Sequence, residues 1–497
     1  MKYGVFSAAI QTELWDSNVW AFILVIGILF VGMILAHMLK RIIPFLNKML
    51  MPASVLGGLL ILIFTTIYQL ITKDVFFDLP MFALDLDNNV TGTTLLDNIT
   101  YHCLGLGFVA MSLRTSDAAK KKGRMGEVFD TGVTTVSTYL IQAIIGLIIT
   151  ISLAQPVVDG LIEGSGVLLA LGFGQGTGQA MNFGKAFADQ VTIMPDYYLK
   201  NGKDFGLAIA ALGFLCASIG GVIYLNILKR QGKVKVVTAE ETEELGLADV
   251  QGKDEIGLNE SIDKFSLQLA FVTIVYAASY GVMSLLIKLI GDPNTQRTIF
   301  GFNFLIGTFL AIGLKNLFRF MRKLGWIHHQ YLNNFMLNRI SGVAFDIMIV
   351  SGIAVINIEL LKSYWLVLLL MTVFGALATF VFIRFVCRRF HKEYKYEQFF
   401  GMYGMLTGTA STGIILLREI DPNFETPASD NMVYQNLPAI IFGFPMLMII
   451  KDAVKSRENA LAVLGILFGY LAFLLILLFR RQIFKKRKKL SKGKSSQ

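Results

Sequence analysis

Charged residues and cysteines are scarce in this 497-residue chain. Only 16% of the residues are charged, whereas 54% are apolar, and the mean hydropathy is +0.60. A soluble core cannot bury that much apolar surface, so a lipid bilayer must cover it. The three cysteines, Cys103, Cys216 and Cys387, show no CxxC or Cys/His spacing. The sequence therefore supports neither a disulfide framework nor a cysteine metal site.

Motifs of ATP-driven and hydrolytic enzymes are absent as well. The sequence contains no GxxxxGK[ST], HExxH or GxSxG motif. The net charge is +10, but the basic residues form short runs beside apolar stretches, as membrane-flanking anchors do. They do not form a face with interleaved aromatics for nucleic acid. We therefore predict a carrier driven by an external gradient, with no cofactor, and neither an enzyme nor a nucleic-acid-binding protein.

Eleven stretches are predicted to span the membrane, on the criterion of about 20 mostly apolar residues. The first group is 18–38, 55–72, 99–113, 131–154 and 205–228. The second is 266–290, 299–318, 340–361, 364–386 and 436–450, followed by one further span at 459–479. Residues 230–265 are polar and poor in aromatics, so we interpret them as a cytoplasmic linker.

The positions of basic residues predict the orientation. Basic clusters lie near 40–48, 114–124, 229–235, 315–323 and 384–395 and in the tail 480–494, whereas the loop 73–100 has one Lys and several Asp. With the N-terminus outside and no cleavage after the first span, every cluster and the C-terminus are cytoplasmic. This requires that two further apolar stretches do not cross the membrane.

Those two stretches are unusually rich in small residues. Residues 160–185 contain eight glycines, and 399–417 read FFGMYGMLTGTASTGIILL. Each interior glycine costs about 1 kcal/mol of helix stability, so breaks are expected. Irregular backbone at membrane depth occurs where it is buried in protein or lines a cavity. We therefore predict two re-entrant hairpins; the alternative is a glycine-rich helix packed closely on its neighbours.

The two stretches also indicate a duplication. An offset of 232 aligns 176–180 with 408–412 and Asp189 with Asp421, and an offset of 230, a shift of two residues, aligns 212–214 with 442–444. Five spans precede the linker, so the second copy is inverted. We predict an all-α polytopic membrane protein with two inverted repeats of five helices, each carrying a hairpin. The predicted segments are 1–229, the linker 230–265, 266–455, and an extra helix with a basic tail at 456–497.

Three sequence runs resemble the bacterial sodium/glutamate symporter family: LGFGQGTGQAMNFGKAFAD, GTASTGIILLREIDP and MPASVLGG. The resemblance covers roughly 18–228 and 266–450. It implies an elevator-type transporter of the inner membrane, a homodimer, that imports an anionic amino acid with Na⁺. The first hairpin has Gln175 where we expect the His of a Gly-His-Gly-Thr core in glutamate carriers, and the second hairpin also differs from theirs.

A carrier needs oxygens for the ion and N–H donors for a carboxylate, and a broken helix exposes both. For the substrate we predict residues from both hairpins: Gln175, Gly176, Thr177, Gly178, Gln179, Asn182, Thr409, Ser411, Thr412 and Arg418. For sodium we predict Gly174, Gly176, Thr407, Gly408 and Asp346. Serine and threonine hydroxyls in these runs have the alternative of bonding back to the preceding turn.

Two charged candidates have explicit alternatives. The Arg418 guanidinium can bind a substrate carboxylate through two parallel N–H donors. Alternatively, Arg418 is an interfacial anchor or pairs with Glu419 or Asp421. Asp346 is the one acid well inside a predicted span, so it coordinates sodium or anchors one helix to another. His102 and Gln142 are interpreted as packing contacts.

Other functions stay open at this stage. Proton coupling, or a different amino acid or a dicarboxylate as substrate, fits the same architecture. Paired re-entrant segments also occur in channels, although two different hairpins in one chain favour alternating access. Only the predicted linker and the basic tail support a third possibility, a transporter-like sensor.

Overall fold

The computed structural model describes residues 17–85, 90–114, 125–154, 157–234, 263–290, 296, 299–422 and 425–494. In these ranges the chain is almost entirely helical, and β pairing is confined to an isolated bridge between Asp85 and Val90. Ten of the described helices are long and apolar enough to cross a membrane. The protein is therefore a multi-pass membrane protein.

The long helices follow the hydropathy pattern along the chain. Before the predicted linker they are α1 (Ser17–Ile42), α3 (Ala53–Thr72), α4 (Gly92–Leu113), α5 (Met125–Leu153) and α8 (Gly202–Arg230). After it they are α10 (Lys264–Ile290), α12 (Asn303–Lys323), α13 (Asn334–Ala354), α14 (Trp365–Phe390), α18 (Asn436–Ile450) and α19 (Arg457–Lys494). Between them lie the short helices α2 (Pro44–Lys48), α6 (Leu168–Gln175), α7 (Thr177–Ala188), α15 (Lys395–Thr407), α16 (Ala410–Arg418) and α17 (Pro427–Tyr434).

Some predicted boundaries are wrong. The span predicted at 340–361 extends too far, because α13 ends at Ala354 and the chain turns so that the N–H of Asn357 donates to Asp204. Helix α4 begins seven residues before the predicted span, and it is not among the ten apolar helices because its first half is polar. Most of the predicted linker, 235–262, and the basic residues of 115–124 lie outside the described ranges.

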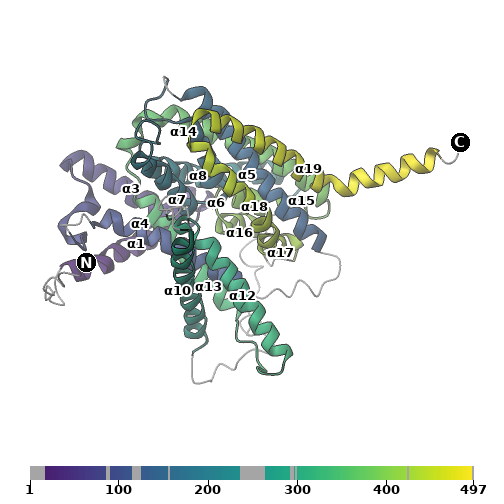
Figure 1. Cartoon of the computed structure of the whole chain (residues 1–497), viewed down its shortest axis with the longest axis horizontal. Helices are drawn as coiled ribbons and strands as arrows, with labels where there is room; N and C mark the ends of the chain where they lie inside the picture. Colours follow the sequence, from purple (N-terminus) through teal and green to yellow (C-terminus); the bar gives the residue numbers. More distant parts are fainter. Residues whose placement is uncertain are drawn as a thin grey trace.

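The helices form two groups (Figure 1). The α4–α13 group consists of α1, α3, α4, α10, α12 and α13, and its centre is the long contact between α4 and α13. In that contact the hydroxyls of Thr100 and Ser351 lie 2.8 Å apart. The hairpin group consists of α5–α8 and α14–α19. In it, α5 packs against α6, α14, α18 and α19, and α8 packs against α6, α7, α15 and α16.

Helix α19 lies along α5 in the hairpin group and extends beyond it at the C-terminal end (Figure 1). Arg480 donates to the Asp130 carboxylate at 2.7 Å, and its guanidinium lies 4.6 Å from the centre of the Phe129 ring. The Asp130 side chain is buried. An arginine that both pairs and stacks fixes the register of α19 on α5.

Facing glycines bring backbones of the hairpin group into direct contact. A Cβ added to Gly404 would lie 2.7 Å from the Cα of Gly413, so α15 and α16 touch without side chains between them. The same closeness joins α7 to α8, where Gly184 faces Gly202. Small residues at helix contacts are typical of membrane proteins, in which packing drives association.

Candidate ion and anion site at the hairpin tips

The chain reverses direction between α6 and α7. Gly176 separates the two helices with φ +83° and ψ −170°, a conformation open to glycine but strained for other residues. The N–H of Lys200 donates to the Gly160 carbonyl at 3.1 Å, and that of Leu199 donates to Phe187 at 3.3 Å. The two ends of the segment therefore lie beside the same short stretch, and α6 and α7 form a hairpin.

A second reversal joins α15 to α16. Gly408 and Thr409 connect the helices, which pack against each other through Gly404 and Gly413. Thr409 caps α16, because its side chain accepts the N–H of Thr412 at 3.4 Å. The turn is thus stabilised by one of its own side chains.

Helix α8 shows that the two hairpins approach each other from opposite ends. Near its start, Gly202 and Gly206 contact Gly184 and Ala180 of α7. In its second half, the Tyr403 hydroxyl donates to Cys216 at 3.1 Å, and Gly221 faces Leu416; both partners are in the second hairpin.

The tips meet between these regions, close to the middle of α8. A Cβ on Gly213 would lie 2.5 Å from the Thr407 carbonyl oxygen and 2.9 Å from the Phe173 ring, so both hairpins reach this residue. A Cβ on Gly176 would lie 3.7 Å from the Thr409 methyl group.

Four helix ends converge at this meeting point. Helices α7 and α16 begin there, and α6 and α15 end there. The first turns of α7 and α16 carry N–H groups and the positive end of the helix dipole, whereas the last turns of α6 and α15 carry carbonyl oxygens. Neither tip, 174–179 or 407–412, contains a charged residue. The arrangement can therefore bind an anion and a cation through main-chain dipoles.

The structure places the predicted residues of the first hairpin at or beside this point. The Thr177 hydroxyl donates to the Met348 carbonyl at 3.3 Å, and Gly178 packs against Leu104 and Met348, so this face rests on the α4–α13 group. Gln179 is fully buried, and both polar atoms of its amide lack a hydrogen-bond partner in the described chain. The buried Asn182 Nδ2 also lacks one.

The remaining predicted residues of that hairpin, Gly174 and Gln175, are at the end of α6. Gly174 packs against the Tyr139 ring, and Gln175 is half-buried beside it.

The buried amide groups of Gln179 and Asn182 are costly without partners, by about 1–3 kcal/mol each, and such groups are typical of sites that receive a ligand or water.

In the second hairpin the threonines are buried or half-buried and partly bonded locally. The Thr407 hydroxyl donates back to the Tyr403 carbonyl at 2.6 Å, as the alternative interpretation of these hydroxyls expected. The hydroxyls of Thr409 and Thr412 lie 3.3 Å apart. Ser411 is half-buried in the first turn of α16, and Gly408 forms the turn itself.

Two predicted residues are not brought to the tips. Arg418 is exposed in the last turn of α16, at the end opposite the tip. Asp346 accepts the Ser54 hydroxyl at 2.7 Å and so connects α13 to α3, which is the helix-anchoring alternative for this residue. Met348, two residues further along α13, contacts the first hairpin.

Comparison with known families decides the assignment. A family model described as sodium/glutamate symporter matches residues 17–424. The chain belongs to the sodium/glutamate symporter family. No curated protein and no solved structure matches the chain. The match ends before α17, so α17, α18 and α19 lie outside it.

One residue that the sequence presents as a packing contact lies beside both hairpins of this symporter-family chain. Gln142 of α5 is fully buried, and its Nε2 donates to the Leu406 carbonyl at 2.8 Å and to the Thr379 hydroxyl at 2.9 Å. Its Oε1 has no hydrogen-bond partner in the described chain, and a Cβ on Gly174 would lie 3.0 Å from it. Gln142 therefore bonds to the second hairpin and lies against Gly174 of the first. A lone polar residue in an apolar span was the only signal in the sequence.

The base of the second hairpin of this family member holds a buried polar network. The Tyr394 hydroxyl donates to Glu127 at 2.7 Å and accepts from Asn431 at 3.1 Å. Because that hydroxyl has one proton, His391 Nδ1, 3.0 Å away, must donate to it. His391 Nε2 then has no partner in the described network. Burial lowers the pKa of His391 to about 4, although nearby Glu127 opposes the shift.

The symporter-family chain is not symmetric around the tips. Sequence alignment pairs 212–214 with 442–444, but Phe214 is fully buried whereas Phe444 is 38% exposed. Gly213 contacts both hairpins, while the nearest atom to a Cβ on Gly443 is Val136 Cγ2 at 3.9 Å. Helix α18 packs on α5 rather than between the hairpins.

Proposed function

We propose that the chain is a sodium-coupled symporter that carries glutamate or a closely related small organic anion across the inner membrane. The observation that carries the proposal is the meeting of two uncharged hairpin tips, at which Gly176 faces Thr409 beside buried amides without partners. An anion needs N–H donors and sodium needs oxygens, and the four helix ends supply both.

In this proposal the substrate carboxylates bind the first turns of α7 and α16 and the side-chain amides of Gln179 and Asn182. Sodium binds carbonyl oxygens at the ends of α6 and α15, near Gly174 and Thr407. Gln142 holds the second tip through the Leu406 carbonyl. Because no fixed cation stands at the tips, substrate is held without a permanent ion pair and can be released.

The two hairpins are re-entrant in this proposal and belong to inverted repeats, 1–229 and 266–455, with α19 as an extra helix. Their approach to the middle of α8 from opposite ends supports this interpretation. The hairpin group then moves against the α4–α13 group as in an elevator, with the N-terminus outside and the C-terminus in the cytoplasm. The last turns of α1, α8, α12 and α14, which we place on the cytoplasmic side, all carry basic residues.

The test is uptake of labelled glutamate into proteoliposomes with sodium and proton gradients imposed separately. We expect saturable uptake and counterflow with an inward sodium gradient. Uptake driven by a proton gradient alone would support the proton-coupled alternative, and flux without saturation or counterflow would indicate a channel.

A matched pair of variants connects transport to the tips. Thr177→Val removes a hydroxyl that bonds across the two helix groups, and we expect it to reduce uptake about tenfold, the effect of about 1.4 kcal/mol. Thr372→Val makes the same change on α14, where the hydroxyl bonds back to Leu368 of its own helix, and we expect little effect. Equal uptake by both variants would contradict the proposed site.

A further inference from the structure

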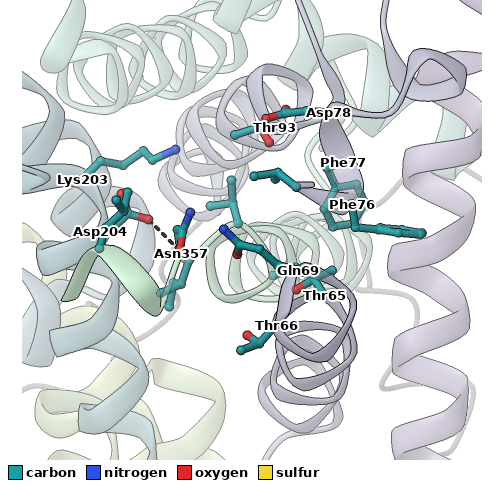
Figure 2. A pocket seen from close by; sticks show the side chains of 15 residues that line it. Thr65, Thr66, Gln69, Phe76, Phe77, Asp78, Thr93, Lys203, Asp204 and Asn357 are labelled. Atoms are coloured by element: carbon teal, nitrogen blue, oxygen red, sulfur yellow. Dashed lines mark hydrogen bonds between the residues drawn. The ribbon is translucent and has the colours of Figure 1, made fainter. Parts of the chain in front are cut away.

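A cavity with both polar and apolar walls lies away from the hairpin tips, where α13 ends and α8 begins (Figure 2). Its volume is about 140 Å³, the space of about four or five water molecules. Its walls come from α3, the 3₁₀ turn η1 (Phe76–Asp78), α4, the start of α8 and the segment after α13. We call it the α13 pocket; its polar side chains are those of Thr65, Thr66, Gln69, Asp78, Thr93, Lys203, Asp204 and Asn357.

Several oxygen acceptors lie in this lining. Asp204 is only 5% exposed; its Oδ1 accepts the N–H of Asn357 at 2.8 Å, and the described chain offers no hydrogen bond to its Oδ2. The hydroxyls of Thr65 and Thr66 donate to Leu62, so their lone pairs remain available to the pocket.

Main-chain oxygens add to these acceptors. The carbonyls of Ala354 and Val355, at the C-terminal end of α13, accept no backbone N–H in the described chain. This helix end also carries the negative end of the α13 dipole.

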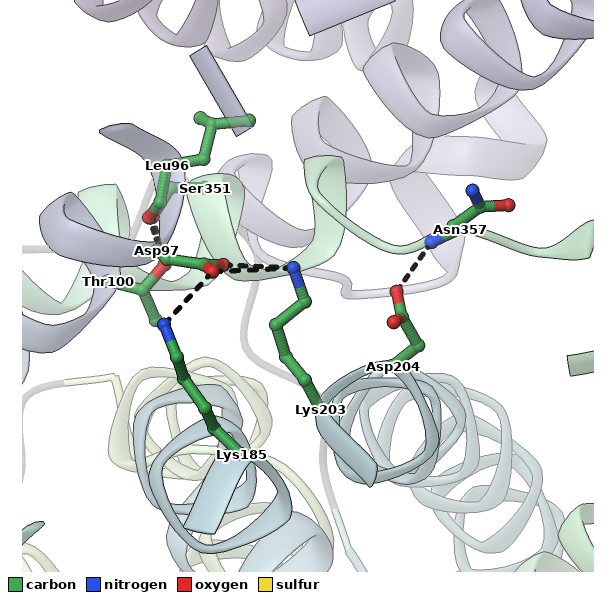
Figure 3. A network of polar contacts seen from close by, with 8 residues as sticks. All are labelled: Leu96, Asp97, Thr100, Lys185, Lys203, Asp204, Ser351 and Asn357. Carbon is green, nitrogen blue, oxygen red and sulfur yellow. Dashed lines mark hydrogen bonds and ion pairs between the residues drawn. The ribbon is translucent and has the colours of Figure 1, made fainter. Parts of the chain in front are cut away.

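The one basic side chain of the lining is already engaged. The Lys203 ammonium lies 3.2 and 3.4 Å from the two oxygens of Asp97, and Lys185 lies 3.6 Å from the same carboxylate (Figure 3). The Asp97 side chain is 10% exposed and that of Lys203 19%. Asp204, by contrast, forms no ion pair in the described chain. The Lys203 charge acts on Asp204 without forming an ion pair with it, and a buried carboxylate that lacks a direct ion pair favours a cation beside it.

We propose that the α13 pocket is a cation site, separate from the hairpin tips, that takes Na⁺ with part of its hydration shell. One buried carboxylate matches one positive charge, and carboxylate, hydroxyl and carbonyl oxygens are the ligands of hard cations. The choice of Na⁺ rests on the proposed function, whereas the fit to a monovalent cation rests on the pocket alone.

The Lys203 ammonium can compete with a bound cation for the Asp204 carboxylate. It lies next to Asp204 in the chain and lines the same pocket, and its ammonium is held on the other side by Asp97. Without the Asp97 charge, the ammonium can pair with the Asp204 carboxylate, on which its charge already acts. Asp97 therefore keeps the pocket open to an external cation.

The experiment measures the apparent melting temperature of the purified protein against NaCl concentration, with choline chloride keeping the ionic strength constant. Asp204→Asn retains an acceptor for the Asn357 N–H but loses the charge, and we expect it to raise the Na⁺ midpoint about tenfold or more. Asp97→Asn is expected to raise the midpoint similarly, because it releases Lys203. Asp97→Asn combined with Lys203→Met is expected to restore a midpoint near that of the wild type.

Lys185→Met is the matched control, since this lysine is 52% exposed and does not line the pocket. Its midpoint should equal that of the wild type. If Asp204→Asn has the same Na⁺ midpoint as the wild type, the cation site is wrong. If Asp97→Asn and the double variant have equal Na⁺ midpoints, Lys203 has no such role. Absence of glutamate-dependent stabilisation and uptake in the wild type would instead refute the proposed function, while the Na⁺ midpoints would still decide the pocket.

Discussion

Replacing Gly176 by alanine tests whether the shape of the first hairpin tip matters for transport. Gly176 has φ +83° and ψ −170°, a region that is essentially restricted to glycine. Holding another residue there costs about 1–3 kcal/mol. The added methyl group itself has room, because the nearest atom, on Thr409, lies 3.7 Å away. The effect is therefore conformational rather than steric.

The size of the effect follows from that strain. Because 1.4 kcal/mol corresponds to a factor of ten, the present tip geometry becomes about 5- to 150-fold less populated in Gly176→Ala. We expect the initial rate of glutamate uptake in proteoliposomes to fall within that range. The apparent melting temperature should change little, since the tip can relax into another conformation without unfolding the hairpin.

A matched control separates tip geometry from the general effect of the substitution. Gly281→Ala in α10 places the new methyl group in open space at a helix interior, where alanine is favoured by about 0.5–1 kcal/mol. This variant should transport like the wild type. Wild-type rates and half-saturation in Gly176→Ala would refute the assignment of the tip to the site.

Three further predictions concern buried polar contacts. Gln142→Met leaves the carbonyl of the second tip without its donor, at a cost of about 1–3 kcal/mol, so uptake should fall about tenfold or more; unchanged uptake would remove Gln142 from the site. Arg480→Gln removes the ion pair between α19 and the buried Asp130 carboxylate, so the melting temperature should fall by several degrees. Adding Asp130→Asn should recover most of that loss, and a double variant as unstable as the single one would contradict the pairing. His391 has a pKa lowered from 6.5 to about 4, so the unfolded chain binds the proton first and stability should fall as pH drops through this window. His391→Gln should flatten this part of the melting-temperature profile, and an unchanged slope would exclude His391 as its source.

Hydropathy predicts the helices well, since each span must contribute about 20 apolar residues whatever its neighbours are. The span at 436–450 coincides with α18 in both boundaries. The end of α13 was missed because Val355 and Ile356 are as apolar as the helix before them. What stops that helix is a long-range bond from Asn357 to Asp204, and the sequence does not show it.

The site is predictable only where the backbone determines it. The glycines and threonines of the tips were found because they interrupt apolar stretches. The sequence does not predict the contacts of Gln142, because one polar residue in a span gives no indication of its partner, and that partner lies 264 residues away. Arg418 was included because of its chemistry and its proximity in sequence, but α16 continues past the tip and carries it to the far end of the helix.

The facing glycines of the hairpin group set a lower limit on the size of any moving part. Where Gly184 of the first hairpin meets Gly202 of α8, and where Gly213 of α8 meets the Thr407 carbonyl of the second hairpin, there is no side chain that could change rotamer to let one backbone slip past the other. A hairpin opening alone, like a flap, would break these contacts without replacement. Displacement of the tips must therefore carry α8 along, and the smallest mobile unit is a bundle rather than a loop.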